Sequence, residues 1–441
     1  MFSYVDDFTV TVGSFSYRRN TQRLQHYYST LKRRANSLGV SFSIPKTELC
    51  HWRTTRDRAP ISSAPVCLDG SLFHPSSLVR WLGYWFTPSM DTTPHFTKRL
   101  ALAQGAFATI KQLSSPGSGL PPYLNRRLAM GLLLPILTYG CDLFSPNVTM
   151  QDKMTVFWNK VMRWITNCFS STPVPILACE ACLPPLFSLL PHRRRMAALR
   201  LACAPPEINP AASRLPPSFP SSSSHRAQDS NRYLTVGLKG NYIPLRWNQA
   251  RPKPAVRSHL PIDGIVNLLT PLSSGTSFFP MVNLHLLPDL PPTVAPGTKS
   301  YSSLKRESRT LLMDHWTLQA PPPLYYLYKP TTVPHAFMGL DRFSAGRIHQ
   351  MRAGKSYLAA HPSWSDDRDP LCPSCEEEDE TFHHAVLSCK SKSEARRLHL
   401  SGVGSIAHDS PLWADKKSLI GLAAYIRATH TNFPPDMLSS A

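Results

Sequence analysis

A long stretch rich in proline and serine, residues 204–300, is the feature that most limits how this chain can fold. The chain has 441 residues and 43 prolines, about twice the usual share. Proline has no backbone N–H and disrupts helix interiors, and no long periodic apolar pattern crosses this stretch. We therefore expect a stiff, extended linker, with ordered structure before residue 204 and again after residue 300.

The charge of the chain is strongly positive and unevenly distributed. The 48 Lys and Arg residues outnumber 28 Asp and Glu, which gives a net charge of +20. Residues 1–203 hold 23 basic and 9 acidic residues, so +14 of this charge lies in the first part. Such a surplus suits a polyanionic partner, either nucleic acid or an anionic membrane surface. A hydrophobic fraction of 42% excludes a wholly disordered basic tail.

The chain lacks the patterns of a secreted or membrane protein. Its start, Met1-Phe2-Ser3-Tyr4-Val5-Asp6-Asp7, has no basic region, so we expect no secretory signal and read the ten cysteines as reduced thiols. The apolar stretch 128–144 contains Pro135 and falls short of the roughly 20 residues of a spanning helix. It predicts a buried helix.

The first ninety residues alternate between strand and helix patterns. Residues 2–12 alternate apolar and polar around two acids, which predicts two strands. Apolar residues from Leu24 to Leu38 have helical spacing, and Gly39 can end this helix in a left-handed conformation. Residues 40–44 alternate again and predict a third strand. The result is an α+β class in which one helix covers an antiparallel sheet.

Helical patterns dominate the remaining ordered parts. Residues 81–86 are mostly aromatic and apolar and predict a strand or hairpin ending at Pro88. Apolar stripes of helical spacing then predict a bundle with basic edges, and two more helices after the linker. The predicted helices are 96–110, 124–136, 154–165, 191–203, 304–316 and 347–359.

Tyr4-Val5-Asp6-Asp7 places two adjacent carboxylates at the tip of the predicted hairpin. Adjacent like charges repel, and they are best tolerated where water or a cation neutralises them. Nucleotidyl transfer uses carboxylates in this way, to hold two Mg²⁺ ions. The alternative is a solvated Asp-Asp turn.

These residues resemble the second half of the palm domain of a non-LTR (LINE-type) retrotransposon reverse transcriptase. The Tyr-x-Asp-Asp match implies that Asp6 is a catalytic metal ligand and that Asp7 is its less directly bound neighbour. The segment 43–48 looks like the next palm motif, and the resemblance makes Lys46 the residue that assists the departing pyrophosphate. Trp81-Leu82-Gly83 is similar to the primer-grip hairpin, and the helices of 96–203 look like the thumb.

The resemblance implies RNA-directed DNA synthesis in target-primed reverse transcription, with Mg²⁺ as cofactor and deoxynucleoside triphosphates as substrates. An RNA template and a DNA primer or target would be the partners, with a nuclear location and no membrane partner. The family's first catalytic aspartate and fingers precede the Tyr-x-Asp-Asp motif, and the chain as given starts at that motif. We therefore expect it to be catalytically incomplete and not to extend a primer alone.

Cys372-x2-Cys375-x8-His384-x4-Cys389 is the most specific motif in the chain. Three thiolates and one imidazole form a closed tetrahedral zinc set, which is structural because no coordination position stays open. His383 is the adjacent alternative ligand, and free thiols are the alternative state. LINE-type proteins often end in a similar Cys-Cys-His-Cys knuckle after a basic helical segment, like residues 342–357 here.

Basic side chains at several places are candidates for contacting nucleic-acid phosphates. For Arg347, Arg352 and Lys355, an ordinary solvated basic surface is the alternative. The candidates are Arg126, Arg127, Arg193, Arg194, Arg195, Arg347, Arg352 and Lys355.

Two further features are better explained by ordinary structural roles than by function. The pair Cys179 and Cys182 has metal spacing, but buried thiols fit its apolar context better. Arg18-Arg19 with Lys32-Arg33-Arg34 fits a charged helix face better than a bipartite nuclear signal.

The chain is therefore expected to be α+β. Its parts are a palm remnant with the primer-grip hairpin (1–90), a helical thumb (91–203), a linker (204–300), a helical segment with a zinc knuckle (301–400) and a tail (401–441). The rival hypothesis is a non-catalytic zinc-knuckle protein that binds nucleic acid and derives from a decayed element.

Overall fold

The structure is a computed structural model that describes part of the chain. Helices and small antiparallel sheets make it an α+β protein. Its described residues fall into two compact units, one drawn from the ranges 1–99, 138–152 and 190–311 and the other from 100–137, 153–189 and 312–441. The described residues are 2–4, 7–14, 16–52, 63–142, 146–202, 305–306, 309–310, 312, 337–360, 369–401 and 416–434. The predicted linker 204–300 lies outside them.

Three two-stranded antiparallel hairpins belong to the first unit. They are β1 Phe2–Tyr4 with β2 Asp7–Thr9, β3 Val66–Leu68 with β4 Ser71–Phe73, and β5 Val79–Trp81 with β6 Tyr84–Phe86. The turns Asp69-Gly70 and Leu82-Gly83 have positive φ at both residues. This is the type I′ geometry, whose twist matches that of the flanking strands. The predicted hairpins at 2–12 and 81–86 are confirmed.

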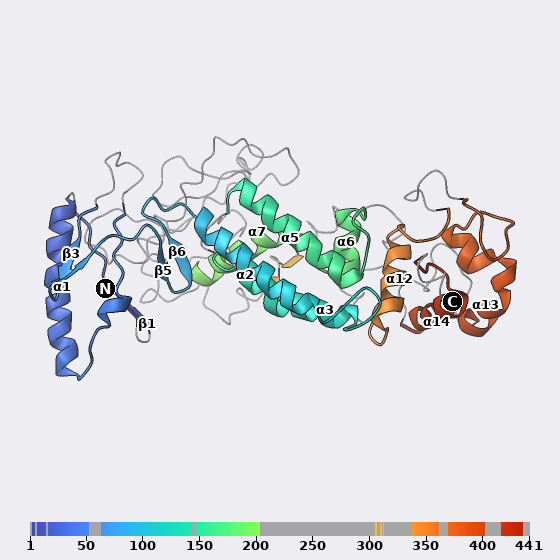
Figure 1. Ribbon diagram of the computed structural model, residues 1–441, viewed down its shortest axis with the longest axis horizontal. Helices are drawn as coiled ribbons and strands as arrows, with labels where there is room; N and C mark the ends of the chain where they lie inside the picture. The colour runs from blue at the N-terminus through green and yellow to red at the C-terminus, as the bar shows by residue number, and fades with distance from the viewer. Residues whose placement is uncertain are drawn as a thin grey trace. The chain divides into compact units, whose positions relative to one another are not determined.

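The helix α1, Tyr17–Ser37, lies beside β3 (Figure 1). Gln25 donates to the carbonyl of Cys67 over 3.2 Å. The helix ends as predicted at Gly39, whose φ is 70°, and the N–H of Val40 donates to the carbonyl of Ala35. The N–H of Gly39 also donates to the carbonyl of Asn36, and the two bonds form a Schellman cap that satisfies the last carbonyls of the helix.

The predicted strand over 40–44 is wrong. This segment has no strand, and the short 3₁₀ helix η1, Ile44–Lys46, begins in it. Pro45 accounts for the difference, because its fixed φ suits a tight turn and its missing N–H cannot pair with a neighbouring strand.

The predicted helices before the linker are confirmed, with shifted ends. Phe107 packs edge-on against Phe157 and Trp164. Trp158 is fully buried, and its indole N–H donates to the carbonyl of Pro184 over 3.1 Å. The elements are α2 Thr93–Lys111, α3 Pro122–Leu128, the π-helical turn η2 Ala129–Leu133, α4 Leu134–Leu137, α5 Val148–Thr166, α6 Val174–Ala181 and α7 Leu186–Ala202.

Within the described residues, no single helix is long and apolar enough to cross a membrane. The bent pair Val174–Ala181 and Leu186–Arg193 meets that length and composition test only when its two helices are combined.

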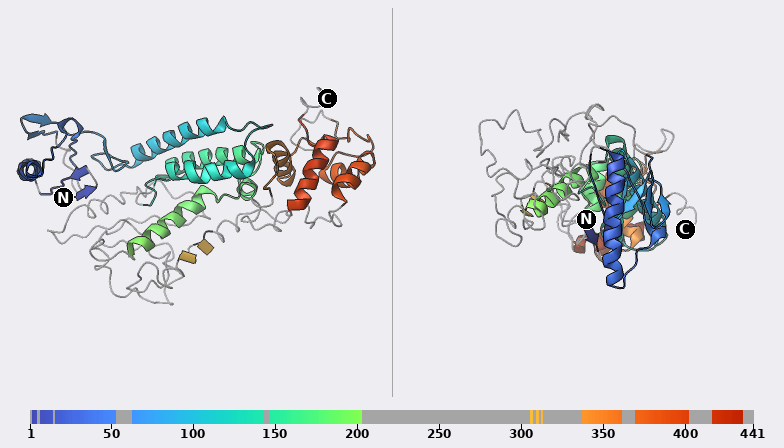
Figure 2. Two further views of the ribbon diagram at one scale, coloured as in Figure 1. Left: turned by 90° about the horizontal axis from the view of Figure 1, so that it is seen from below. Right: turned by 90° about the vertical axis from the view of Figure 1, so that its left-hand side faces the viewer.

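The C-terminal helices, orange and red in Figure 2, pack around one apolar core. Ile348, Val386, Leu422 and Tyr425 are each fully buried there, and Cys182 from the end of α6 joins them. The elements are α12 Arg342–Arg352, the π turn η5 His384–Ser388, η6 Lys390–Lys392, α13 Ser393–Leu400 and α14 Lys416–Thr429. The sequence pattern places α14 in a tail, whereas its apolar side completes this core.

Candidate functional site

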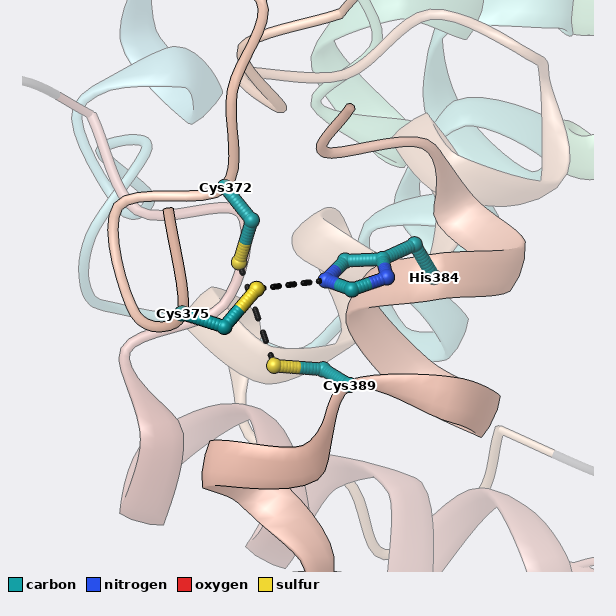
Figure 3. A group of neighbouring side chains, drawn as sticks. All are labelled: Cys372, Cys375, His384 and Cys389. Carbon is teal, nitrogen blue, oxygen red and sulfur yellow. Dashed lines mark hydrogen bonds between the residues drawn. The ribbon is translucent and has the colours of Figure 1, made fainter. Parts of the chain in front are cut away.

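Four side chains of the second unit converge on one point (Figure 3). The sulfurs of Cys372, Cys375 and Cys389 and a ring nitrogen of His384 all lie within 4.8 Å of one another. The sulfurs of Cys372 and Cys389 are 3.9 Å apart, close to the roughly 3.8 Å edge of a tetrahedron with metal–sulfur bonds of about 2.3 Å. This group can hold a metal ion, with ligands at the predicted positions.

The first two cysteines lie in a tight turn that presents both sulfurs on one side. The N–H of Cys372 donates to the carbonyl of Glu378, and the N–H of Glu376 donates back to the carbonyl of Cys372, both over 2.8 Å. Glu376 takes the left-handed conformation, with a φ of 59°. A β-bridge between Leu371 and Asp379 closes the turn at its base.

A π-helical turn brings the other two ligands together. In η5 the N–H of Cys389 donates to the carbonyl of His384 over 2.9 Å, which closes the wider i to i+5 ring. The hydroxyl of Tyr425 on α14 donates to the carbonyl of Ala385 over 2.6 Å. The buried core therefore fixes the turn that carries His384 and Cys389.

The surroundings of the group favour metal binding. Nδ1 of His384 lies 2.7 Å from Glu378 Oε2, while its Nε2 lies 3.2 Å from the Cys375 sulfur. A carboxylate that accepts from one ring nitrogen leaves the other free to bind a metal. The backbone N–H groups of Glu377 and Glu378 lower the pKa of Cys375 to about 7, despite partial burial. A thiol with this pKa is substantially thiolate at neutral pH, the form that binds metals.

A buried ionic group joins α6 to α12 in the same unit. Glu180 Oε1 lies 3.0 Å from Arg352 Nε, and Glu180 Oε2 lies 2.6 Å from His349 Nδ1. The Glu180, Arg352 and His349 side chains are each 2% exposed. The ring of His349 also stacks on Phe337, with 4.0 Å between ring centroids.

Arg342 makes a second buried connection within the unit. Its guanidinium donates to the carbonyls of Trp164 and Ile165 at the end of α5, the latter over 2.6 Å. A cation there compensates the negative end of the helix dipole. Burial lowers the pKa of Arg342 to about 10.

The arginines predicted to contact nucleic acid lie in different environments. Arg347 is 2% exposed and packs over the rings of Phe343 and Tyr357, and Arg352 is 3% exposed and paired with Glu180. In this conformation these two guanidinium groups are not accessible to phosphate. They hold α12 against its neighbours.

The remaining predicted basic residues are more accessible. Arg127 is exposed, whereas the half-buried Arg126 donates to the carbonyl of Cys182 over 3.1 Å. Arg193 is paired with Asp142 over 3.3 Å, and Lys355 is half-buried. The side chains of Arg194 and Arg195 lie outside the described residues.

The Tyr-x-Asp-Asp motif spans the connection between two paired strands. The register of β1 and β2 pairs Tyr4 with Asp7. Asp7 is exposed, and Asp6 lies outside the described residues, so the predicted magnesium pair stays a prediction. Lys46 is exposed in η1, and the ring of Phe42 lies 5.6 Å from Phe8 of β2.

The turn of the β5–β6 hairpin is held by Arg99 of α2 and by Tyr139, which follows α4. Tyr139 donates to the carbonyl of Leu82 and Arg99 to that of Gly83, each over 2.6 Å. Its Trp85 ring lies 4.3 Å from the ammonium of Lys98 and 5.7 Å from the guanidinium of Arg80. The structure thus places two exposed cations against one aromatic side chain.

Two functional residues were missed from the sequence. Glu378 lies in an acidic run that argues against phosphate contact, and its spacing from His384 carries no known motif. Glu180 lies between two cysteines, and its single charge in an otherwise apolar stretch is the signal from which a buried partner could have been inferred. The expectation of buried thiols is confirmed for Cys182, while Cys179 is half-buried.

Comparison with known proteins identified no relative: no family model, curated protein or solved structure matches the chain.

Proposed function

We propose that Cys372, Cys375, His384 and Cys389 hold a structural zinc ion. Three sulfurs and one imidazole nitrogen are the donors that zinc takes in closed tetrahedral sites. Their mutual distances, all within 4.8 Å, support this proposal. Because the protein fills all four positions, the ion stabilises the fold and takes no part in catalysis.

Glu378→Gln should weaken zinc binding about tenfold to a hundredfold, the usual cost of losing a partner that orients a ligand. The carboxylate accepts from Nδ1 of His384 and so presents Nε2 to the metal. Competition with a chromophoric chelator measures the affinity, and the absorption spectrum of the Co²⁺ form reports whether the ligand set stays intact.

Glu377→Gln is the matched control for this change. It removes the same charge one residue away, from an exposed carboxylate that pairs with Lys390 over 3.1 Å. Equal losses of affinity in the two variants would show that only the charge matters, and would contradict a positioning role for Glu378.

We also propose that the chain is a nucleic-acid-binding fragment of a LINE-type reverse transcriptase, with the palm remnant and the thumb in residues 1–203. The observation that carries this proposal is the register of β1 and β2, which puts the Tyr-x-Asp-Asp motif across the turn of an antiparallel hairpin, followed by the helix α1. The family resemblance adds RNA-directed DNA synthesis with Mg²⁺, and the zinc centre would help bind element RNA or target DNA.

The full chain should bind an RNA–DNA template-primer duplex with little sequence preference. Contacts to phosphates release counterions, so log Kd should rise steeply and linearly with log salt concentration. Fluorescence anisotropy with a labelled duplex between 50 and 200 mM salt measures this dependence. Absence of binding at 50 mM salt would contradict the proposal.

A primer-extension assay tests whether this chain is catalytically incomplete, as the resemblance implies. Extension with Mg²⁺ that is lost in Asp7→Asn would assign polymerase activity to this chain. Binding without extension fits both the catalytically incomplete reverse transcriptase and the non-catalytic nucleic-acid-binding protein, which the sequence also allows.

A further inference from the structure

The exposed face of α1 carries basic residues toward both of its ends. The helix contains 21 residues and no Asp or Glu, but six Lys and Arg residues. At 100° per residue, Arg19, Arg23, Arg33 and Arg34 fall on one side of the helix. All four are exposed. This set of four arginines, called the α1 basic face below, extends about 22 Å along the helix axis.

An aromatic side chain lies at one edge of the α1 basic face. Tyr27 is 50% exposed and lies between Arg23 and Arg34 along the helix. The opposite side of the helix is occupied by contacts within the unit. There Tyr28 donates to Asp69 over 2.5 Å, and Ala35 is buried.

Few acids offset the charge of this face. Lys32 pairs with Asp69 over 2.7 Å, but it lies outside the basic face. Arg23 donates to the carbonyl of Gly13 over 3.0 Å, and because this acceptor is neutral the positive charge of Arg23 stays uncompensated. Among the described residues, no carboxylate pairs with Arg19, Arg33 or Arg34.

We propose that the α1 basic face binds a single-stranded RNA segment, with its arginines on the phosphates and Tyr27 stacked on an unpaired base. Charge complementarity and an aromatic beside a basic track are the features of sequence-tolerant binding to single strands. A membrane surface fits less well, because a helix that lies in a bilayer needs a broad exposed apolar face. Here the apolar residues Leu24, Leu31 and Ala35 turn away from that exposed face and are half-buried or buried.

The proposal rests on the proposed nucleic-acid function and adds a separate binding surface to it. The full chain carrying Arg19→Gln, Arg33→Gln and Arg34→Gln tests it with a labelled 20-nucleotide single-stranded RNA. Gln keeps a high helix propensity, so α1 should stay folded, as circular dichroism can verify. We expect affinity at 50 mM salt to fall about tenfold or more, and the slope of log affinity against log salt to flatten by about 2.

The matched control removes three exposed charges elsewhere, with Arg309→Gln, Lys416→Gln and Lys417→Gln. Both triple variants have the same net charge, so equal behaviour would overturn the proposal. If the unmodified chain binds neither this RNA nor the template-primer duplex, the proposed function fails as a whole. If it binds the duplex but not the single-stranded RNA, or if the arginine substitutions on α1 leave RNA binding unchanged, this inference alone fails.

Tyr27 provides a second, independent measurement. Tyr27→Ala should weaken RNA binding about fivefold or more, while Tyr27→Phe keeps the ring and should restore affinity. Vesicles of anionic lipid serve as the competing partner. Binding to vesicles that depends on the same arginines, without binding to RNA, would also overturn the proposal.

Discussion

Cys372→Ser should abolish metal binding and unfold the segment that surrounds the proposed zinc centre. The side chain is fully buried, and the four donor atoms lie within 4.8 Å of one another. Zinc contributes on the order of 10 kcal/mol to the folding of small zinc modules. Elemental analysis should give no zinc in the variant, and limited proteolysis with mass spectrometry should find new cleavage between residues 369 and 401.

Cys67→Ser is the control for the loss of one thiol, because Cys67 is exposed on β3 and far from the ligand set in sequence. It should keep its metal content and its proteolytic pattern. A chelator added to the unmodified chain should reproduce the effect of Cys372→Ser. Unchanged proteolysis after complete removal of the metal would contradict a structural role.

The unfolding that follows loss of the metal should not extend evenly through the second unit. The turn η5 is also held by Tyr425, and Lys392 is anchored by Thr431 over 3.1 Å, both independently of the ligands. The helices α12 and α14 share the apolar core of Ile348 and Leu422. Cleavage should therefore appear first in the turn of Cys372 and Cys375, which has little core of its own.

Local sequence patterns predicted local structure well. Ligand spacing identified all four residues of the metal group, because the Cys-x2-Cys pair and the His-x4-Cys pair each bring two donors within reach of one ion. A period-two pattern identified the hairpin at 2–12, an aromatic run before Pro88 identified the one at 81–86, and Gly39 marked the end of α1. The Asp69-Gly70 turn carried an equally clear hairpin signal that predicts β3 and β4, and it was overlooked.

Long-range pairing could not be predicted in the same way. Arg352 reads as a basic surface residue, yet its partner Glu180 lies 172 positions earlier in the chain. Nothing in either local sequence specifies the other. The apolar spacing of Leu419, Leu422 and Ile426 does predict the buried side of α14, but only the fold shows that Cys182 of α6 joins the same core.

Glu180→Ala should destabilise the second unit by about 3–5 kcal/mol, the usual cost of breaking a buried ion pair. Arg352 would keep its charge in an interior site with 3% exposure, and His349 would lose its hydrogen-bond acceptor. Glu394→Ala is the control, since its pair with Arg397 is exposed to solvent and contributes little to stability. Chemical denaturation measures both free energies of unfolding, and equal effects would contradict the prediction.

The same buried group should make the unit less stable in acid. Burial lowers the pKa of His349, and this effect outweighs the opposing effect of Glu180. The folded state therefore keeps the ring neutral, whereas the unfolded chain takes up a proton below about pH 6.5. Burial alone would raise the pKa of Glu180, but Arg352 and His349 lower it, so this carboxylate adds stability that is lost at still lower pH. Both shifts mean that the unfolded chain binds more protons, and the free energy of unfolding must then fall as the pH falls.

Denaturation curves between pH 7 and pH 4 should show this decrease in the free energy of unfolding, first through protonation of His349 and then through protonation of Glu180. In Glu180→Ala the second part of the decrease should disappear.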